Sequence, residues 1–304
     1  MPTVTSNSID IAYDEYGSPG DPALLMVMGL GLPCSAWPPE FIEMLVEEGL
    51  RVIIFDNRDI GLSQRFDAAG MPNLFVESLR RNFGFSVRAP YALTDMMQDT
   101  AGVLDALDIQ SAHVVGISMG GMIAQLLAIH EPSRVRSLTS IMSTTGNSRL
   151  PRASRRVTRH IIRGPRSASP EGRLDYYRKL AWLIGSPDYR PDTAEVDARL
   201  ERVFARGMSP ASTARQATAI LSAGSRVEAL RKLDVPTIVI HGEADPLVRV
   251  ECGYDTAAAI PGAQLTTIPG MGHDLPRALW PRFTKLIAGH VKATDAAADD
   301  HKAA

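Results

Sequence analysis

The sequence predicts an α/β protein whose central sheet is mostly parallel and is flanked by helices. Two observations support this fold class. Apolar segments of strand length alternate with longer segments whose apolar residues recur at helical spacing, and turn-forming Gly, Pro and Asp separate them. The strand-like segments are apolar throughout, which is typical of parallel sheets that are buried on both faces.

The alternation runs through the first half of the chain. Residues 9–16 alternate roughly between apolar and polar side chains, which predicts an early, exposed strand. Thr94 is a suitable N-cap for a helix that ends at Leu107. The expected elements are strands at 9–16, 23–28, 51–55, 112–117 and 135–142, and helices at 39–49, 94–107 and 122–128.

The alternation stops between residues 144 and 233, where helix-like segments are interrupted by Gly and Pro. It resumes with a strand at 235–240, a helix at 251–260, a strand at 264–268 and a closing helix at 275–291. We therefore predict a core formed by residues 1–143 and 234–292, into which residues 144–233 are inserted as a helical cap. The Ala- and Asp-rich tail, 293–304, is predicted to be disordered.

Composition argues against several classes of protein. With 304 residues, 45% of them hydrophobic, and a formal net charge of −2, the chain is expected to be globular and to have no nucleic-acid partner. No apolar run approaches the roughly 20 residues that span a bilayer, and the N-terminus lacks the features of a signal peptide. Cys34 and Cys252 form no C-x-x-C pair, so we expect a cytoplasmic location and no structural zinc. Homodimer formation is left open.

Arginine is concentrated at the start of the predicted cap. Seven arginines fall between residues 149 and 166, whereas no acidic residue occurs between Glu131 and Glu171. Such a segment could bind an anionic partner or substrate. The interpretation that we favour is a solvated helix face that pairs with acidic groups elsewhere.

The most informative segment is a predicted strand, sharp turn and helix around one serine, Ser118. Gly116 precedes this serine by two residues and Gly120 follows it by two, which gives the pattern G-x-S-x-G. Side chains at the glycine positions would collide where the strand and helix backbones pass, and the turn presents the serine hydroxyl clear of the sheet. A flexible loop is the alternative, but the flanking elements and the partner residues favour a nucleophile.

A serine hydroxyl needs a base, and the base needs an orienting acid. His273 follows a predicted core strand in a loop that is stiffened by Pro269, so its imidazole can reach the carboxyl edge of the sheet. The acid is expected at the end of the preceding strand, where we choose Asp245, before Pro246, with Glu243 as the alternative. The chain order serine, aspartate, histidine is the one expected for a nucleophile on such a turn. The other histidines are expected in strands, at helix ends, in the cap or in the tail: His113, His130, His160, His241, His290 and His301.

The oxyanion formed by such an attack needs two N–H donors. The Met119 N–H, at the start of the helix, is the first, and the Leu30 N–H, in the loop after the second predicted strand, is the other. Gly29 and Gly31 let this loop approach a substrate. The same glycines, with Asp56 after the next strand, also suggest a dinucleotide-binding fingerprint. A cysteine in place of the third glycine, and prolines that displace the helix start, argue against it.

Longer motifs surround these residues: Val27-Met28-Gly29, Ala36-Trp37-Pro38, Asp56-Asn57-Arg58-Asp59-Ile60-Gly61-Leu62-Ser63, His113-Val114-Val115-Gly116-Ile117-Ser118-Met119-Gly120 and Ile268-Pro269-Gly270-Met271-Gly272-His273-Asp274-Leu275-Pro276. Through them the core, 1–143 and 234–292, resembles the α/β-hydrolase superfamily, and within it the aclacinomycin methylesterase-like esterases. The resemblance implies a serine hydrolase with a Ser–His–Asp triad, no metal and no organic cofactor. Ser118 argues against haloalkane and epoxide chemistry, for which such relatives need Asp at this position.

The resulting hypothesis is hydrolysis of a small carboxylic ester. Ser118 attacks the carbonyl, His273 transfers the proton and Asp245 orients the imidazole. The alternatives are cleavage of a carbon–carbon bond in a diketone-like substrate, perhydrolysis, and a non-catalytic binding protein that keeps this fold. The predicted pocket walls, each of which could also be ordinary core, are Met28, Gly29, Leu32, Trp37, Met142, Trp182 and Phe204.

Overall fold

The computed structural model describes residues 2–165, 167 and 169–303, with side chains as far as residue 300, so Arg166 and the His301 side chain lie outside it. In the sheet, β2 pairs antiparallel with β1 and β4, and the other pairs are parallel, which confirms the predicted fold class. The strand order is β1-β2-β4-β3-β5-β6-β7-β8. The strands are β1 (Thr3–Ser6), β2 (Ile9–Tyr16), β3 (Ala23–Val27), β4 (Arg51–Phe55), β5 (Ala112–Ile117), β6 (Val135–Ile141), β7 (Thr237–Gly242) and β8 (Gln264–Ile268).

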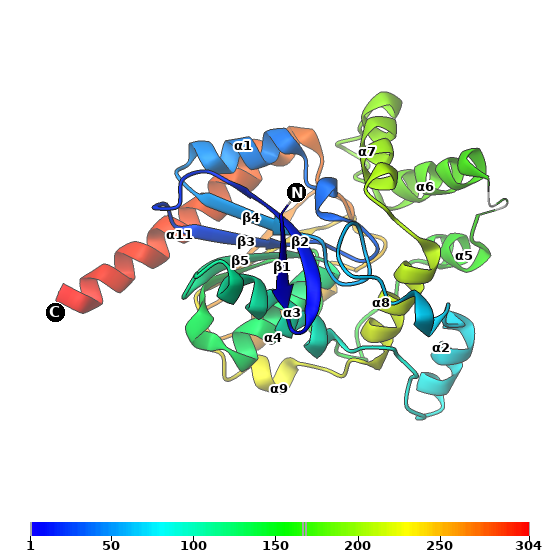
Figure 1. The fold of residues 1–304 in the computed structure, drawn as a ribbon, viewed down its shortest axis with the longest axis horizontal. Coiled ribbons are helices and arrows are strands. Elements are labelled where there is room, and N and C mark those ends of the chain that lie inside the picture. Colours follow the sequence, from blue (N-terminus) through cyan, green and yellow to red (C-terminus); the bar gives the residue numbers. More distant parts are fainter. Residues whose placement is uncertain (1, 166, 168, 304) are drawn as a thin grey trace.

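Helices cover both faces of the sheet (Figure 1). α3 (Leu93–Ala106), α4 (Met119–His130) and α10 (Glu251–Ala259) pack on one face, and α1 (Pro39–Glu47) and α11 (Trp280–Ala303) pack on the other. Alternate residues of β3 serve the two cores: Leu25 faces the α4 side, whereas Leu24 and Met26 face the α11 side. A strand between two helical layers has to be apolar on both faces, which explains the continuous apolar segments of the sequence.

The chain between β6 and β7 forms helices. α5 (Arg155–Arg163), α6 (Pro170–Ile184), α7 (Thr193–Ala205) and α8 (Pro210–Ser222) lie together at one end of the molecule (Figure 1). α9 (Val227–Leu230) instead packs on α4 and α10 of the core. The division into a core and a cap at residues 144 and 233 therefore stays a prediction, since the last helix of that range belongs with the core helices.

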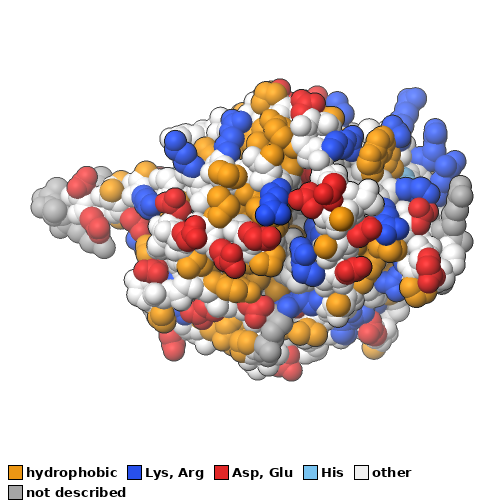
Figure 2. Space-filling view, turned by 90° about the horizontal axis from the view of Figure 1, so that it is seen from above, with side chains coloured by type: hydrophobic (Ala, Val, Ile, Leu, Met, Phe, Trp, Pro, Cys, Tyr) orange, Lys and Arg blue, Asp and Glu red, His pale blue; other side chains and the backbone are white. Residues whose placement is uncertain are grey.

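The basic start of the cap is solvated. Arg155, Arg156, Arg159 and Arg163 of α5 are all exposed. Figure 2 shows Lys and Arg side chains gathered at the cap end of the molecule, while acidic and basic side chains are interspersed over the rest of this face. The Arg156 guanidinium lies over the indole of Trp182, 5.4 Å from the ring centroid, so this arginine has an aromatic partner.

One helix of the structure was not predicted, and another begins before its predicted N-cap. α2 (Leu74–Asn82) was not predicted, although Asn73 is a residue type that commonly caps helices. Its side-chain oxygen accepts hydrogen bonds from the backbone N–H groups of Phe75 and Val76. α3 begins at Leu93, before Thr94, because the Asp95 carboxylate accepts the Ala92 N–H at 2.8 Å and so caps the helix from inside its first turn.

The tail is helical where disorder was predicted. α11 continues to Ala303 because alanine has the highest helix propensity, and because Asp295 fixes the helix to the core. The Asp295 carboxylate lies 2.5 Å from Arg136 Nη2 and 3.0 Å from His113 Nε2. Neither α11, which has 24 residues, nor another of the described helices combines the length and apolar character needed to cross a membrane.

Candidate active site

Ser118 lies at the sharp turn between β5 and α4. Its backbone has a φ of 56° and a ψ of −118°, in a region that residues with side chains rarely adopt. A Cβ at Gly116 would lie 2.3 Å from the Gly120 carbonyl oxygen, and a Cβ at Gly120 would lie 2.0 Å from the Val27 carbonyl oxygen. β5 can pass α4 this closely only with glycine at position 116, and β3 can pass α4 only with glycine at position 120, which is the steric reason for the G-x-S-x-G pattern.

The Ser118 hydroxyl, the His273 imidazole and the Asp245 carboxylate form one chain of hydrogen bonds. His273 Nε2 lies 3.0 Å from Ser118 Oγ, and His273 Nδ1 lies 2.6 Å from Asp245 Oδ2. Because an ionised carboxylate only accepts hydrogen bonds, Nδ1 carries the proton and Nε2 is left to accept one from the serine. Glu243, the alternative acid, is exposed and accepts a hydrogen bond from Thr267 instead.

Asp245 is ionised although only 1% of its surface is exposed. Its Oδ1 accepts the backbone N–H groups of Leu247, at 2.8 Å, and Val248, at 2.9 Å. Burial raises the pKa of Asp245, but the charges and hydrogen bonds of His273 and His241 outweigh it and lower this pKa to about 2. The site therefore keeps a negative charge beside His273 Nδ1, where it would stabilise an imidazolium.

His241 lies behind Asp245. The sequence predicted a packed residue at the end of a strand, and the side chain is indeed fully buried in β7. Its Nε2 donates to the Val248 carbonyl oxygen at 2.8 Å and lies 3.6 Å from Asp245 Oδ2. A Cβ at Gly253 would lie 2.7 Å from His241 Nδ1, so α10 holds the ring in place. The two residues are close in the chain, but His241 lies in a strand, where a spacing of four residues does not by itself indicate a side-chain contact.

The loop after β3 lies beside the serine. A Cβ at Gly29 would be 3.4 Å from Ser118 Cβ and 3.9 Å from its hydroxyl oxygen, so a methyl group at this position would be in van der Waals contact with the serine side chain. Met119 is the first residue of α4, where the N–H lacks an acceptor in a preceding helical turn. The roles of Leu30 and Met119 as oxyanion donors nevertheless remain a prediction.

Three polar contacts hold this loop in place. Asn57 Nδ2 donates to the Met28 carbonyl oxygen at 3.0 Å, and the Cys34 N–H donates to Asp56 Oδ1 at 2.7 Å. The third contact comes from the cap: the Gly31 N–H donates to the Gln216 side chain of α8 at 2.8 Å. Cys34 itself is a buried thiol, and burial, with the Asp56 charge second, raises its pKa. Its side chain is therefore an inert core group rather than a reactive one.

The 56–63 motif, to which the sequence assigned no contacts, joins the core to the cap. Both Asp56 oxygens accept from Arg206 Nε, at 3.0 and 2.8 Å. Asp59 forms a bidentate pair with Arg215 of α8, at 2.5 and 2.7 Å, and both side chains are fully buried. Because its oxygens are occupied in this way, Asp56 is not available to a ribose, which argues further against dinucleotide binding.

The predicted pocket residues fall into three environments. Met28, Trp37 and Met142 are buried in the core on the α11 side, and Leu32 and Phe204 pack partly buried against it, whereas Gly29 lies against Ser118. Trp182 is 56% exposed on α6, between the guanidinium groups of Arg156 and Arg190. The assignment of these residues to a substrate pocket stays a prediction.

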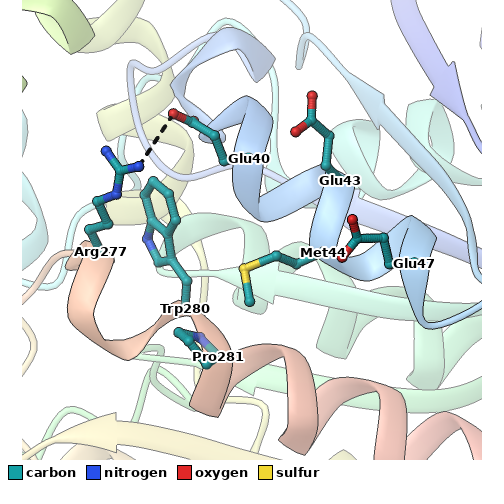
Figure 3. A pocket seen from close by; sticks show the side chains of 7 residues that line it. All are labelled: Glu40, Glu43, Met44, Glu47, Arg277, Trp280 and Pro281. Carbon is teal, nitrogen blue, oxygen red and sulfur yellow. Dashed lines mark ion pairs between the residues drawn. The ribbon is translucent and has the colours of Figure 1, made fainter.

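A surface hollow lies away from the serine, between α1 and the first turn of α11 (Figure 3). Three glutamates of α1 and Trp280 line it, and Glu40 approaches Arg277 to 4.0 Å across its rim. A neighbouring cleft, between α7 and the chain after His273, is lined by Arg199, Asp274 and Leu275 among others. The second cleft thus reaches the residue that follows the candidate base.

A comparison with protein-family models matches residues 22–276 to the alpha/beta hydrolase fold. The chain belongs to this family. The alpha/beta hydrolase match includes β3 to β8 and the residues at which Ser118, Asp245 and His273 lie. In this family the nucleophile, the acid and the histidine follow in the order found here.

Two alpha/beta hydrolases similar to this chain are rhodomycin D methylesterases. DauP from Streptomyces sp. (strain C5) is 28% identical over 314 residues, which cover 96% of this chain and 99% of the relative. DnrP from Streptomyces peucetius is 28% identical over 313 residues, with the same coverage. The similarity therefore extends through the cap as well as the core.

Solved structures agree on the fold. The enol-lactonase from Burkholderia xenovorans LB400 superposes with a TM-score of 0.73 at 21% identity, covering 96% of this chain and 100% of its own. A meta-cleavage product hydrolase from Pseudomonas fluorescens IP01 superposes with a TM-score of 0.74 at 19% identity, covering 96% and 98%. At these identities the likeness concerns the fold alone.

Proposed function

We propose that this alpha/beta hydrolase cleaves small carboxylic esters through an acyl-enzyme on Ser118. The observation that carries the proposal is the chain of hydrogen bonds from the Ser118 hydroxyl through the His273 imidazole to the ionised Asp245. These are the groups that a neutral hydroxyl needs in order to act as a nucleophile. The two methylesterase relatives support an ester as the substrate.

The proposed mechanism uses these three groups in turn. Ser118 Oγ attacks the ester carbonyl while His273 Nε2, 3.0 Å away, takes its proton. The N–H groups of Leu30 and Met119 stabilise the resulting oxyanion. The imidazolium then protonates the departing alcohol, and Asp245 stabilises its charge. Water, activated by the same imidazole, hydrolyses the acyl-enzyme and restores the serine.

Carbon–carbon bond cleavage in a diketone, perhydrolysis and ligand binding without catalysis need the same scaffold, so the experiment must separate them. Wild type and Ser118→Ala are assayed with a chromogenic short-chain ester, a methyl ester and a diketone, and the wild type is treated with an organophosphonate. Ester turnover that disappears in Ser118→Ala supports the proposal. Turnover of the diketone without the esters, or no covalent labelling of Ser118, refutes it.

The cellular setting is a proposal from the sequence alone. Two isolated thiols and the balanced charge suit a cytoplasmic enzyme that meets a small-molecule ester. Size-exclusion chromatography with light scattering would decide between a monomer and the homodimer that the sequence leaves open.

A further inference from the structure

The loop that carries His273 is bound to the cap more extensively than the sequence suggests. The His273 N–H donates to the Ile184 carbonyl oxygen at 2.7 Å, at the C-terminal end of α6. The N–H of the residue before, Gly272, donates to Ser186 Oγ at 2.8 Å. The candidate base and its neighbour are thus fixed by the junction between α6 and α7.

Asp274, the residue after the base, is also bonded to the cap, and this completes a hydrogen-bonded bridge between residues 272–274 and 184–186. Ser186 Oγ donates its proton to Asp274 Oδ1 at 2.5 Å, and the Ser186 N–H donates to the same oxygen at 3.1 Å. One buried serine therefore bonds to both neighbours of His273, accepting from one and donating to the other. Three successive residues of the loop, 272–274, are hydrogen-bonded to the cap segment 184–186.

The two segments also pack without spare volume. A Cβ at Gly272 would lie 2.5 Å from the Ile184 carbonyl oxygen, and a Cβ at Gly185 would lie 3.1 Å from Asp274 Oδ2. Further along, a Cβ at Gly270 would lie 2.0 Å from Asp188 Oδ2. The Gly272 backbone faces the backbone of Ile184 and Gly185 directly, so a displacement of the α6–α7 junction has to displace the histidine loop.

We infer that Ser186 is a positioning residue for His273, which couples the conformation of the cap to the alignment of the base. The inference rests on the proposed function of His273. A shift of the imidazole by a fraction of an ångström lengthens its contact with the Ser118 hydroxyl, so the base is aligned only while the junction is in place. The cap then contributes to the rate as well as to the shape of the pocket.

The test compares two ways of breaking the bridge with one conservative replacement. Ser186→Ala removes both hydrogen bonds of the Ser186 hydroxyl, and Asp274→Ala removes both hydrogen bonds of the Asp274 carboxylate. Each variant is expected to lower kcat by roughly tenfold to a hundredfold with little change in KM. Asp274→Asn keeps an acceptor oxygen for Ser186 and should recover most of the loss seen in Asp274→Ala. The second alanine variant keeps the test decisive if the first does not fold.

The matched control is Ser169→Ala. Ser169 caps the N-terminus of the same helix, α6, by accepting the Gly172 N–H at 3.1 Å, and it does not belong to the bridge. This variant should lower the Tm in the same way as Ser186→Ala and leave kcat within about twofold. Equal kcat losses in Ser169→Ala and Ser186→Ala, or an unchanged kcat in both alanine variants of the bridge, would overturn the inference.

Two further measurements separate this inference from the proposed function. The rate at which an organophosphonate labels Ser118 reports on the base without any ester substrate: no labelling of the wild type refutes the proposed function, whereas equal rates in wild type and Ser186→Ala refute the inference. The NMR signal of the His273 Nδ1 proton, hydrogen-bonded to Asp245, needs no reaction at all. It should be displaced or broadened in Ser186→Ala, and an unchanged signal also refutes the inference.

Discussion

The substitution Asp245→Asn tests the candidate site in depth, because the structure dictates how the new amide must point. Asp245 Oδ1 accepts two backbone N–H groups, at 2.8 and 2.9 Å. An amide keeps these bonds only with its oxygen at that position, so its NH₂ group faces His273 Nδ1. That nitrogen must then accept, the proton moves to Nε2, and the imidazole cannot take the Ser118 proton. We expect kcat to fall by a factor on the order of 10⁴.

The same substitution should cost stability in a pH-dependent way. The pKa of Asp245 is lowered from 3.8 to about 2 in the folded protein. A folded pKa below the unfolded one means that the carboxylate stabilises the fold above about pH 4 and that this contribution is lost as the pH falls toward 2. At roughly 1.4 kcal/mol for each pKa unit, the contribution at pH 7 is about 2 kcal/mol, and about half of it remains at pH 3.

Urea unfolding of wild type and Asp245→Asn at pH 7 and pH 3 measures the stability term, and ester turnover at pH 7 measures the catalytic one. Glu243→Gln is the matched control, because Glu243 is an exposed acid at the end of the same strand and should leave both quantities unchanged. Retention of more than a hundredth of the wild-type kcat, or an equal loss of stability at the two pH values, would show that the reasoning is wrong.

Three further predictions concern the scaffold. Arg215→Met removes the bidentate cation partner of the buried Asp59 carboxylate and leaves it the more distant Arg65, 4.0 Å away. It should lower the free energy of unfolding by about 3–5 kcal/mol in urea; a loss below about 1 kcal/mol contradicts this. Gly120→Ala places a Cβ 2.0 Å from a β3 carbonyl oxygen and should cost about 3 kcal/mol or more by the same assay, while Gly289→Ala, in open space, should be neutral or stabilising. Burial lowers the pKa of His113 against the opposing effect of Asp295, so stability should fall as the pH drops below about 6.5. His113→Gln should reduce that slope between pH 7 and pH 5, and an unchanged slope would contradict the assignment.

The sequence predicts those parts of the molecule that depend on local chemistry. The strand, turn and helix around Ser118 could be predicted because the G-x-S-x-G pattern is local in the chain, although the Gly120 position is restricted by Val27 of β3. The choice of His273 and Asp245 rested on their places after predicted strands, and parallel strands bring such places to one edge. The geometry between them follows from the sheet order, in which β5, β6, β7 and β8 are neighbours.

The sequence was less informative where distant residues decide the outcome. Asp59 and Arg215 are 156 residues apart in the chain, and neither carries a local signal for a buried pair. The helical tail depends on Asp295 meeting Arg136 across the surface of the core. Trp182 is a residue type that often lines pockets, but its side chain is exposed and contacts two arginines at the surface. Each of these outcomes is set by tertiary contacts, which periodicity and propensity do not contain.

The contact between residues 184–186 and the histidine loop limits how substrate preference can diverge among proteins built in this way. If the segment between β6 and β7 were replaced by that of another hydrolase, the α6–α7 junction, which we call the corner, would be replaced with it. Gly272 and Asp274 would then lose the Ser186 hydroxyl as their partner. We expect changes of substrate specificity to arise from substitutions in α5 and on the exposed face of α6, while the sequence of the α6–α7 junction stays unchanged. Chimaeras that retain the native corner should therefore turn over substrate, and chimaeras that replace it should be folded but slow.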